Sequence, residues 1–205
     1  MPRPLHLAAA LAGTALALPA LAAPQDFDFK DPKGVNGVSF VMDSKLEPIV
    51  GIVGGVAGTV RYDQDEPAAI TGSVTVDLAT VRMISTGMTQ TLKGDDWLGI
   101  ESSFPATISF ERATLKSEPD AAETVLAVSA VLSFGAVELP LTLDLSPEFI
   151  AGGAEERGGA ESGDLLVLRS MFQLDRKALG IKPDMPTQTV GPTIMVMAPI
   201  AGYGQ

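Results

Sequence analysis

The chain has 205 residues, no cysteine and a formal net charge of −11, with 46% hydrophobic but only 5% aromatic residues. A nucleic-acid backbone rewards clustered Lys and Arg, whereas the basic residues here are scattered among more numerous carboxylates, so we expect no nucleic-acid partner. The lack of Cys excludes disulfides and a thiol for lipid attachment within this chain.

The first 22 residues have the three parts of a secretory signal peptide. Arg3 gives a positive start, residues 7–18 form an apolar run, and Ala20-Leu21-Ala22 fits the small-x-small cleavage pattern. A membrane anchor is the alternative, but the run is shorter than the roughly 20 residues that cross a bilayer. We expect a mature single domain, residues 23–205, without a membrane span and located in the periplasm or secreted. Its 13 basic and 25 acidic residues give a net charge of −12.

Apolar and polar residues alternate with a period of two in several stretches of the mature chain. This pattern predicts β-strands with one buried and one solvent-exposed face. The clearest run, residues 137–145, places a Val and four Leu on one face. Seven further candidates are residues 38–43, 56–62, 70–77, the stretch around Ile108 and Phe110, 126–134, 164–174 and 193–201. About eight short strands joined by turns favour an antiparallel barrel or sandwich.

Two breaks in these patterns indicate special backbone positions. Four glycines between residues 51 and 58 interrupt an apolar stretch, which is consistent with a bend or bulge at a barrel corner or with a plain loop. Pro140 lies inside the clearest strand pattern and cannot donate a ladder hydrogen bond. We expect it to face outward at an edge or a bulge.

Residues 81–100 are the only stretch with helical prospects, and they contain the single Trp, Trp97. Asp95 and Asp96 stand beside it, where an apolar neighbour can raise a carboxyl pKa enough for acid–base catalysis. The simpler interpretation, which we favour, is that they cap the short helix that holds Trp97.

Residues 152–164 combine glycines with carboxylates and contain no large apolar residue. We interpret them as a solvated loop that tolerates shortening. A calcium site is the alternative, although the alternating Asp/Asn pattern with a distal Glu is missing.

The mature chain has neither His nor Cys, because the sole His is His6. This excludes Ser-His-Asp and Cys-His nucleophile arrangements, the usual zinc ligand sets and haem ligation by His. No phosphate-binding glycine loop or dinucleotide fingerprint follows a predicted strand. We therefore expect a protein that is not an enzyme and needs no cofactor.

Two segments resemble the YceI-like family. Residues 94–110, with Trp97, Pro105 and Phe110, resemble its "D-x-F-(D)-x-x-x-Y-P-x-x-x-F" segment, and residues 174–181, LDRKALGI, look like its "I-D-R-x-x-F-G-I" stretch. Residues 85–93 depart from the family's "R-D-x-H-L" helix, since they contain neither its His nor its Arg.

The resemblance implies an all-β, lipocalin-like antiparallel barrel of about eight strands with one or two short helices. It also implies a ligand, a long isoprenoid chain such as a polyprenyl lipid or an isoprenoid quinone. An eight-stranded barrel can enclose one ligand or fill its interior with its own side chains. The predicted ligand-binding residues, each of which could instead be ordinary core, are Phe40, Val60, Val74, Val76, Val128, Leu141, Leu143 and Phe172 in the wall, with Trp97 and Leu98 near the mouth.

Two other functions stay open at this stage. One is an exported enzyme that acts on a lipid or glycan through carboxylates, and the other is a filled β-domain with a structural or interaction role. A homodimer is equally open.

The signal peptide generates the first testable prediction. N-terminal sequencing of the protein exported by its native host should begin at Ala23, because Ala20 and Ala22 occupy the small positions before the cleavage site. Retention of residues 7–18 in the purified protein would contradict export with cleavage.

Overall fold

The computed structural model describes residues 23–46, 48–118, 121–160 and 162–205, so the predicted signal peptide lies outside it. Its strands are β1 (Gln25–Asp28), β2 (Val38–Met42), β3 (Ile49–Val53), β4 (Thr59–Tyr62), β5 (Thr71–Asp77), β6 (Arg82–Met83), β7 (Pro105–Leu115), β8 (Leu126–Phe134), β9 (Val137–Ile150), β10 (Leu165–Asp175) and β11 (Thr193–Gly204). The helices are α1 (Thr86–Lys93) and α2 (Gly153–Arg157), with 3-10 turns η1 (Pro67–Ala69) and η2 (Leu78–Thr80).

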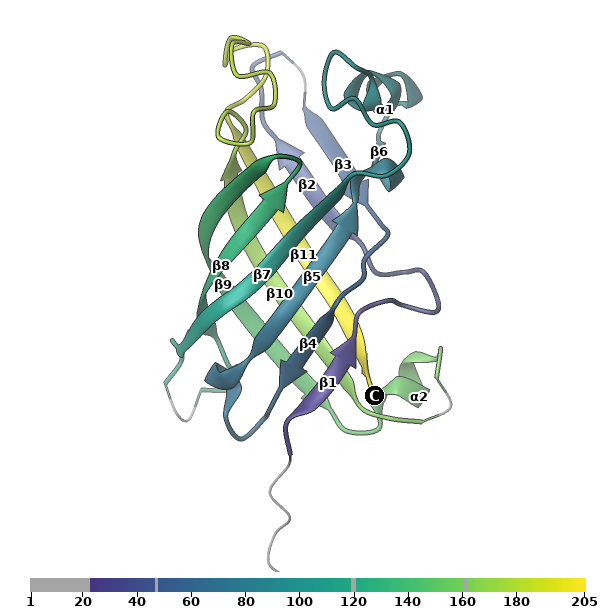
Figure 1. The fold of residues 1–205 in the computed structure, drawn as a ribbon, viewed down its shortest axis with the longest axis vertical. Helices are drawn as coiled ribbons and strands as arrows, with labels where there is room; N and C mark the ends of the chain where they lie inside the picture. Colours follow the sequence, from purple (N-terminus) through teal and green to yellow (C-terminus); the bar gives the residue numbers. More distant parts are fainter. Residues whose placement is uncertain (1–22, 47, 119–120, 161) are drawn as a thin grey trace, which may run out of the picture.

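Eight of the strands close into an antiparallel barrel, in the order β1-β4-β5-β7-β8-β9-β10-β11 and back to β1 (Figure 1). Strand β1 closes the ring, because Phe27 lies opposite Val60 of β4 on one side and Gly204 of β11 on the other. The predicted fold class is confirmed. Strands β1, β3 and β6 were not predicted: β1 and β6 are only four and two residues long, and β3 runs into the glycine stretch that predicted a bend or a loop.

Strands β2, β3 and β6 extend the sheet beyond the first half of β11, where Met195 lies opposite Val41. The chain then bends through the predicted glycine cluster, and Ala57 exchanges backbone hydrogen bonds of 2.9 and 2.8 Å with Thr75 of β5. Gly58 has a φ of +124°, and a Cβ there would come within 2.3 Å of the Ser73 carbonyl oxygen. The bend therefore requires glycine at this position.

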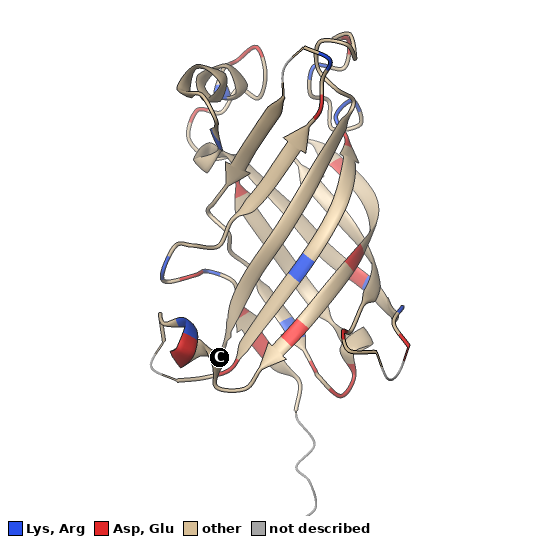
Figure 2. Cartoon of the chain, turned by 180° about the vertical axis from the view of Figure 1, so that it is seen from behind, with Lys and Arg blue, Asp and Glu red and all other residues tan. Residues whose placement is uncertain are grey.

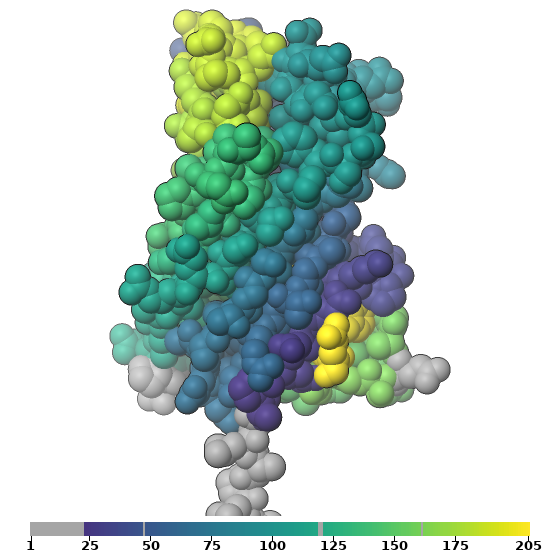
Figure 3. Space-filling model, in the orientation of Figure 1, coloured from purple at the N-terminus to yellow at the C-terminus, as the bar shows by residue number. Residues whose placement is uncertain are grey.

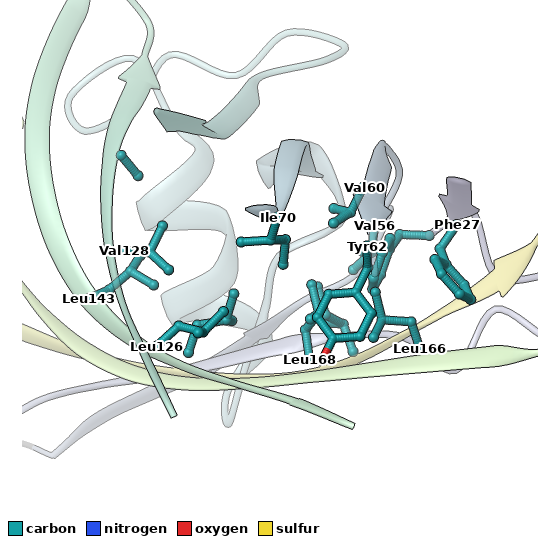
Figure 4. Close-up of a cluster of buried hydrophobic side chains, with 14 residues drawn as sticks. Phe27, Val56, Val60, Tyr62, Ile70, Leu126, Val128, Leu143, Leu166 and Leu168 are labelled. Carbon is teal, nitrogen blue, oxygen red and sulfur yellow. The ribbon is translucent and has the colours of Figure 1, made fainter. Parts of the chain in front are cut away.

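The half of the barrel closed by β1 is filled by its own side chains (Figure 4). Phe27 and Phe149 meet edge to face with ring centroids 6.1 Å apart. The fully buried members of this core include Phe27, Phe29, Val60, Leu126, Val128 and Leu166. On β8, Leu126, Val128, Ala130, Leu132 and Phe134 all face inward, as the alternation predicts.

The loop of residues 152–164 is not the solvated segment that its composition predicts, and that interpretation was wrong. It contains α2, whose Ala154 is buried against Leu165, Ala201 and Tyr203. Arg157 donates to the Tyr203 hydroxyl at 2.8 Å, and to Asp31 Oδ2 and Asn36 Oδ1 at 3.1 Å each. Small residues let the loop pack closely, so shortening it would remove a buried anchor.

Asp31 is the acidic centre of this anchor, and its side chain is only 2% exposed. Burial raises the pKa of Asp31, but hydrogen bonds from the backbone N–H groups of Lys33 and Val35, together with the Arg157 guanidinium, outweigh that effect. The pKa of Asp31 therefore lies below its ordinary value, and the ionised form stabilises the fold.

The Asp31→Asn variant should lower the free energy of unfolding at pH 7 by about 2 kcal/mol, because the donors around residue 31 lose a charged acceptor. Since the folded-state pKa is depressed, the wild-type advantage is complete above the unfolded pKa and disappears as pH falls through the folded value. Urea denaturation at pH 7 and pH 3 measures the difference.

Glu148→Gln is the matched control, because Glu148 makes an ion pair with Arg169 in which both side chains are about half exposed. It should change stability by well under 1 kcal/mol. An equal loss in both variants, or a loss for Asp31→Asn that does not shrink at low pH, would contradict the role of the buried pair.

Candidate functional site

The other half of the barrel encloses an apolar cavity of about 190 Å³. Its floor is the top of the filled core, formed by Leu145, Leu168 and Ile200. Its walls include Phe40, Val74, Val76, Ile108, Phe172 and Val196. Ser170 and Arg176 are the only lining residues with polar side chains among those described.

The volume of the cavity limits what it can hold. Pockets for drug-sized ligands measure about 300–1,000 Å³, so this one is small. A short apolar segment fits as the walls stand, whereas a long hydrocarbon chain fits only if the walls move apart. The lining contains flexible residues that permit such movement, including Met42 and several Leu.

Two loops meet over the open end of the cavity, as Figure 3 shows at the top of the molecule. One follows α1 and contributes Trp97 and Leu98, and the other joins β10 to β11 and contributes Leu179 and Ile181. Trp97 packs against the cluster that contains Leu179 and also against a second cluster around Met42. The mouth is therefore covered by apolar side chains from both loops.

Arg176, which is completely buried, holds the β10–β11 loop in place. Its Nε donates to the Gly191 carbonyl at 3.0 Å, and one terminal nitrogen donates to the carbonyls of Ile181, at 2.6 Å, and Lys182. The other terminal nitrogen reaches the carbonyls of Met185 at 3.3 Å and Val190 at 3.4 Å. All five N–H donors of the guanidinium are thus occupied by backbone oxygens.

No ion pair to Arg176 occurs within the described part of the chain. A buried charge is tolerated only when it is fully hydrogen-bonded, and here the carbonyl ring supplies that solvation. The Arg176 guanidinium is therefore a cation whose hydrogen-bond donors are all occupied. It has no free donor to offer a ligand.

The turn after Arg176 aims two side chains into the mouth. Gly180 adopts a φ of +73°, which glycine tolerates best, and the Ile181 N–H returns to the Arg176 carbonyl at 3.1 Å. Leu179 and Ile181, on either side of Gly180, both line the cavity. The segment singled out in the sequence, residues 174–181, therefore builds the cover of the cavity.

Seven of the ten predicted ligand-binding residues lie on the cavity lining: Phe40, Val74, Val76, Trp97, Leu98, Leu143 and Phe172. The structure places Val60 and Val128 in the filled core below the floor, both at 0% exposure. Leu141 packs against the mouth cluster of Leu132 and Phe134 but does not reach the cavity. Alternation identifies the face of a strand but not the height of a residue along the barrel.

Sequence reasoning missed several lining residues. Val196 and Ile200 alternate inward along a predicted strand, and that alternation could have identified them. Leu179 and Ile181 lie in a loop without periodicity, so the family motif was the only signal for them.

The carboxylates beside Trp97 do not cap a helix. Helix α1 begins after Ser85, whose hydroxyl accepts from the Met88 N–H at 3.0 Å, and Asp95 and Asp96 lie in the turn that follows the helix. The side chain of Asp96 is 98% exposed, so it lies in water rather than against apolar side chains. The interpretation of these residues as caps was wrong, because the helix ends before them.

The comparisons with known proteins come from a family model and from solved structures. The model of the YceI-like domain matches residues 33–201, which is most of the chain. The chain belongs to the YceI-like family. No curated protein matches it in sequence.

Several solved structures share the fold at low sequence identity. BcnA of Burkholderia cenocepacia has a TM-score of 0.64 at 15% identity, over 81% of this chain and 95% of BcnA. A Campylobacter jejuni YceI protein has a TM-score of 0.59 at 14% identity, over 76% and 84% of the two chains. A polyisoprenoid-binding domain of Saccharophagus degradans has a TM-score of 0.56 at 12% identity, over 89% and 100%.

The Arg176 clamp generates a prediction about the loop that covers the cavity. Arg176→Met should lower the free energy of unfolding by about 3 kcal/mol, because it leaves carbonyl groups of residues 181–191 without donors. Hydrogen exchange of residues 177–192 should become faster than in the wild type. Lys177→Met, at the exposed neighbouring position, is the control, and equal exchange in the two variants would contradict the clamp.

Proposed function

We propose that this protein is an exported lipid-binding protein that holds an isoprenoid chain, such as a polyprenyl lipid or an isoprenoid quinone, in the upper half of its barrel. The observation that carries the proposal is the chemistry of the cavity. Its lining is aliphatic and aromatic, and of its two polar side chains Arg176 has every donor occupied. Such a site favours the binding of hydrocarbon and has almost no free hydrogen-bonding groups for a polar substrate.

The energetics suit a long, flexible, apolar ligand. Each buried methylene contributes roughly 0.8 kcal/mol, so several isoprene units could bind tightly with almost no polar recognition. The Saccharophagus degradans neighbour, described as a polyisoprenoid-binding domain, supports the same ligand class. Entry of a long chain requires the upper barrel to widen beyond its present volume.

Binding without turnover is the form of the proposal that the residues favour. The mature chain has no His or Cys, and Asp95 and Asp96 beside Trp97 are exposed to solvent. Within the described residues, no helix is both long and apolar enough to span a bilayer. Export to the periplasm or beyond rests on the sequence of residues 1–22.

Leu143→Asp tests the cavity directly, because Leu143 lines it from β9. An unpaired carboxylate against hydrocarbon is strongly unfavourable, so isoprenoid recovered by organic extraction and mass spectrometry should fall at least about tenfold. Water can enter the emptied cavity, and circular dichroism should therefore still show a β-fold.

Thr142→Asp is the matched control, since Thr142 is the next residue on the same strand and faces outward. It should retain the wild-type amount of lipid. Wild-type lipid content in folded Leu143→Asp would contradict the proposed site.

A further inference from the structure

The wall of the barrel is not hydrogen-bonded along its whole height. Strands β9 and β10 pair only from Leu165 opposite Ile150 to Ser170 opposite Leu145. Above that point, residues 137–144 of β9 pair with β8 alone, and residues 171–175 of β10 pair with β11 alone. We call the boundary between these two unpaired strand edges the seam.

The lower end of the seam is marked by one side-chain hydrogen bond. The Ser170 hydroxyl donates to the Asp144 carbonyl at 2.6 Å, at the point where the ladder stops. Pro140 lies on the unpaired part of β9, is exposed, and has no N–H to offer a neighbouring strand. A proline and a shortened ladder are the usual means by which proteins keep a strand edge from pairing.

The cavity lies directly behind the seam. Leu143, on one edge, and Phe172 and Leu174, on the other, all line it. Opening the wall between β5 and β7, β7 and β8, β8 and β9 or β10 and β11 would break ladder hydrogen bonds, whereas parting these two edges separates only side-chain contacts. The seam is therefore a part of the wall that can move aside without breaking a ladder.

The outer surface on the β10 side of the seam carries apolar residues, whereas Asp144 is exposed on the β9 side. Met171 is 60% exposed, lies at the seam, and stands opposite Met197 of β11. Two residues earlier on β11, Met195 stands opposite Val41 of β2, and Val41 stands opposite Val50 of β3. Figure 2 shows this side of the barrel from behind, with long uncharged stretches on the upper parts of its strands. The row that starts at Met171 and Met197 continues through Ser39 and Ile52, and the next residue in it is Arg82 of β6.

We propose that the seam between β9 and β10 is a lateral port through which the apolar ligand enters and leaves the cavity. This inference rests on the proposed lipid-binding function and specifies its route. The two loops over the barrel end stay packed through Trp97 and the Arg176 clamp, while the seam parts to admit the chain. The same parting enlarges a cavity that is too small for a long hydrocarbon.

A disulfide across the seam, which we call a staple, tests the port because it can be formed and reduced at will. The chain has no Cys of its own, so only the introduced thiols can react. Asp144→Cys with Met171→Cys places thiols at the first opposite positions beyond the last ladder pair, both on the exposed face. Ser146→Cys with Arg169→Cys is the matched control, because these residues are opposite each other inside the ladder.

Each variant is loaded with dansyl-labelled geranylgeraniol in the reduced state, oxidised, and mixed with phosphatidylcholine vesicles. Release of the probe is followed by its fluorescence. The seam staple should slow release at least about tenfold when oxidised, and reduction should restore the rate, while the control staple leaves the rate unchanged. If the seam disulfide does not form, a bis-maleimide between Thr142→Cys and Gln173→Cys bridges the same two edges.

Unchanged release from the stapled seam would overturn the port and place entry at the barrel end. Equal slowing by both staples would also overturn it, since general stiffening would then be the cause. Failure of the reduced and wild-type proteins to take up the probe at all would overturn the proposed function itself.

Discussion

The interior of an eight-stranded barrel has room for inward-facing side chains and little more, so the size of those side chains decides whether a ligand can enter. In this protein the side chains fill one half of the barrel and leave a cavity in the other half. Near β1 the interior receives aromatic rings, with Phe27, Phe29 and Tyr62 buried and Phe149 packed against them. Toward the mouth, the lining contains Phe40, Phe110 and Phe172 together with Val, Leu and small residues such as Ala106 and Ala198, and these side chains leave a space. A stable filled half thus supports a half that is free to bind.

The covered mouth follows from a second constraint, the burial of a cation. Arg176 cannot remain buried unless its donors are satisfied, and backbone carbonyls from Ile181 to Gly191 satisfy them. This requirement folds the β10–β11 loop back over the barrel and positions Leu179 and Ile181 above the cavity. Charge solvation at one residue thereby shapes an apolar site at another.

The longer strands were predictable because inward-facing apolar residues alternate along them with outward-facing residues. The alternation in residues 126–134 and 137–145 identified β8 and most of β9, and Pro140 is exposed at an unpaired edge, as its chemistry predicts. The position of a residue along the barrel axis was not predictable, because it depends on strand register and closure. Val60 and Val74 look alike in sequence, yet one lies in the filled core and the other on the cavity wall.

Contacts between side chains and backbone atoms could not be predicted from the sequence either. The partners of Arg176 are carbonyl groups, which every residue has, so no pattern of side chains predicts the clamp. The anchor of α2 was missed for a related reason: a loop of Gly, Ala and Glu reads as solvated, although Arg157 reaches Asp31, 126 positions earlier in the chain.

The central claim is that the upper half of the barrel binds an apolar chain while the lower half does not. Isotope-filtered NMR on protein with labelled Val and Leu methyl groups, loaded with an unlabelled isoprenoid, measures this directly. The account predicts contacts from the ligand to the methyls of Val74, Leu143 and Val196 and none to those of Val60 or Val128. Ligand contacts confined to outward-facing methyls, or contacts that reach Val60 and Val128, would contradict it.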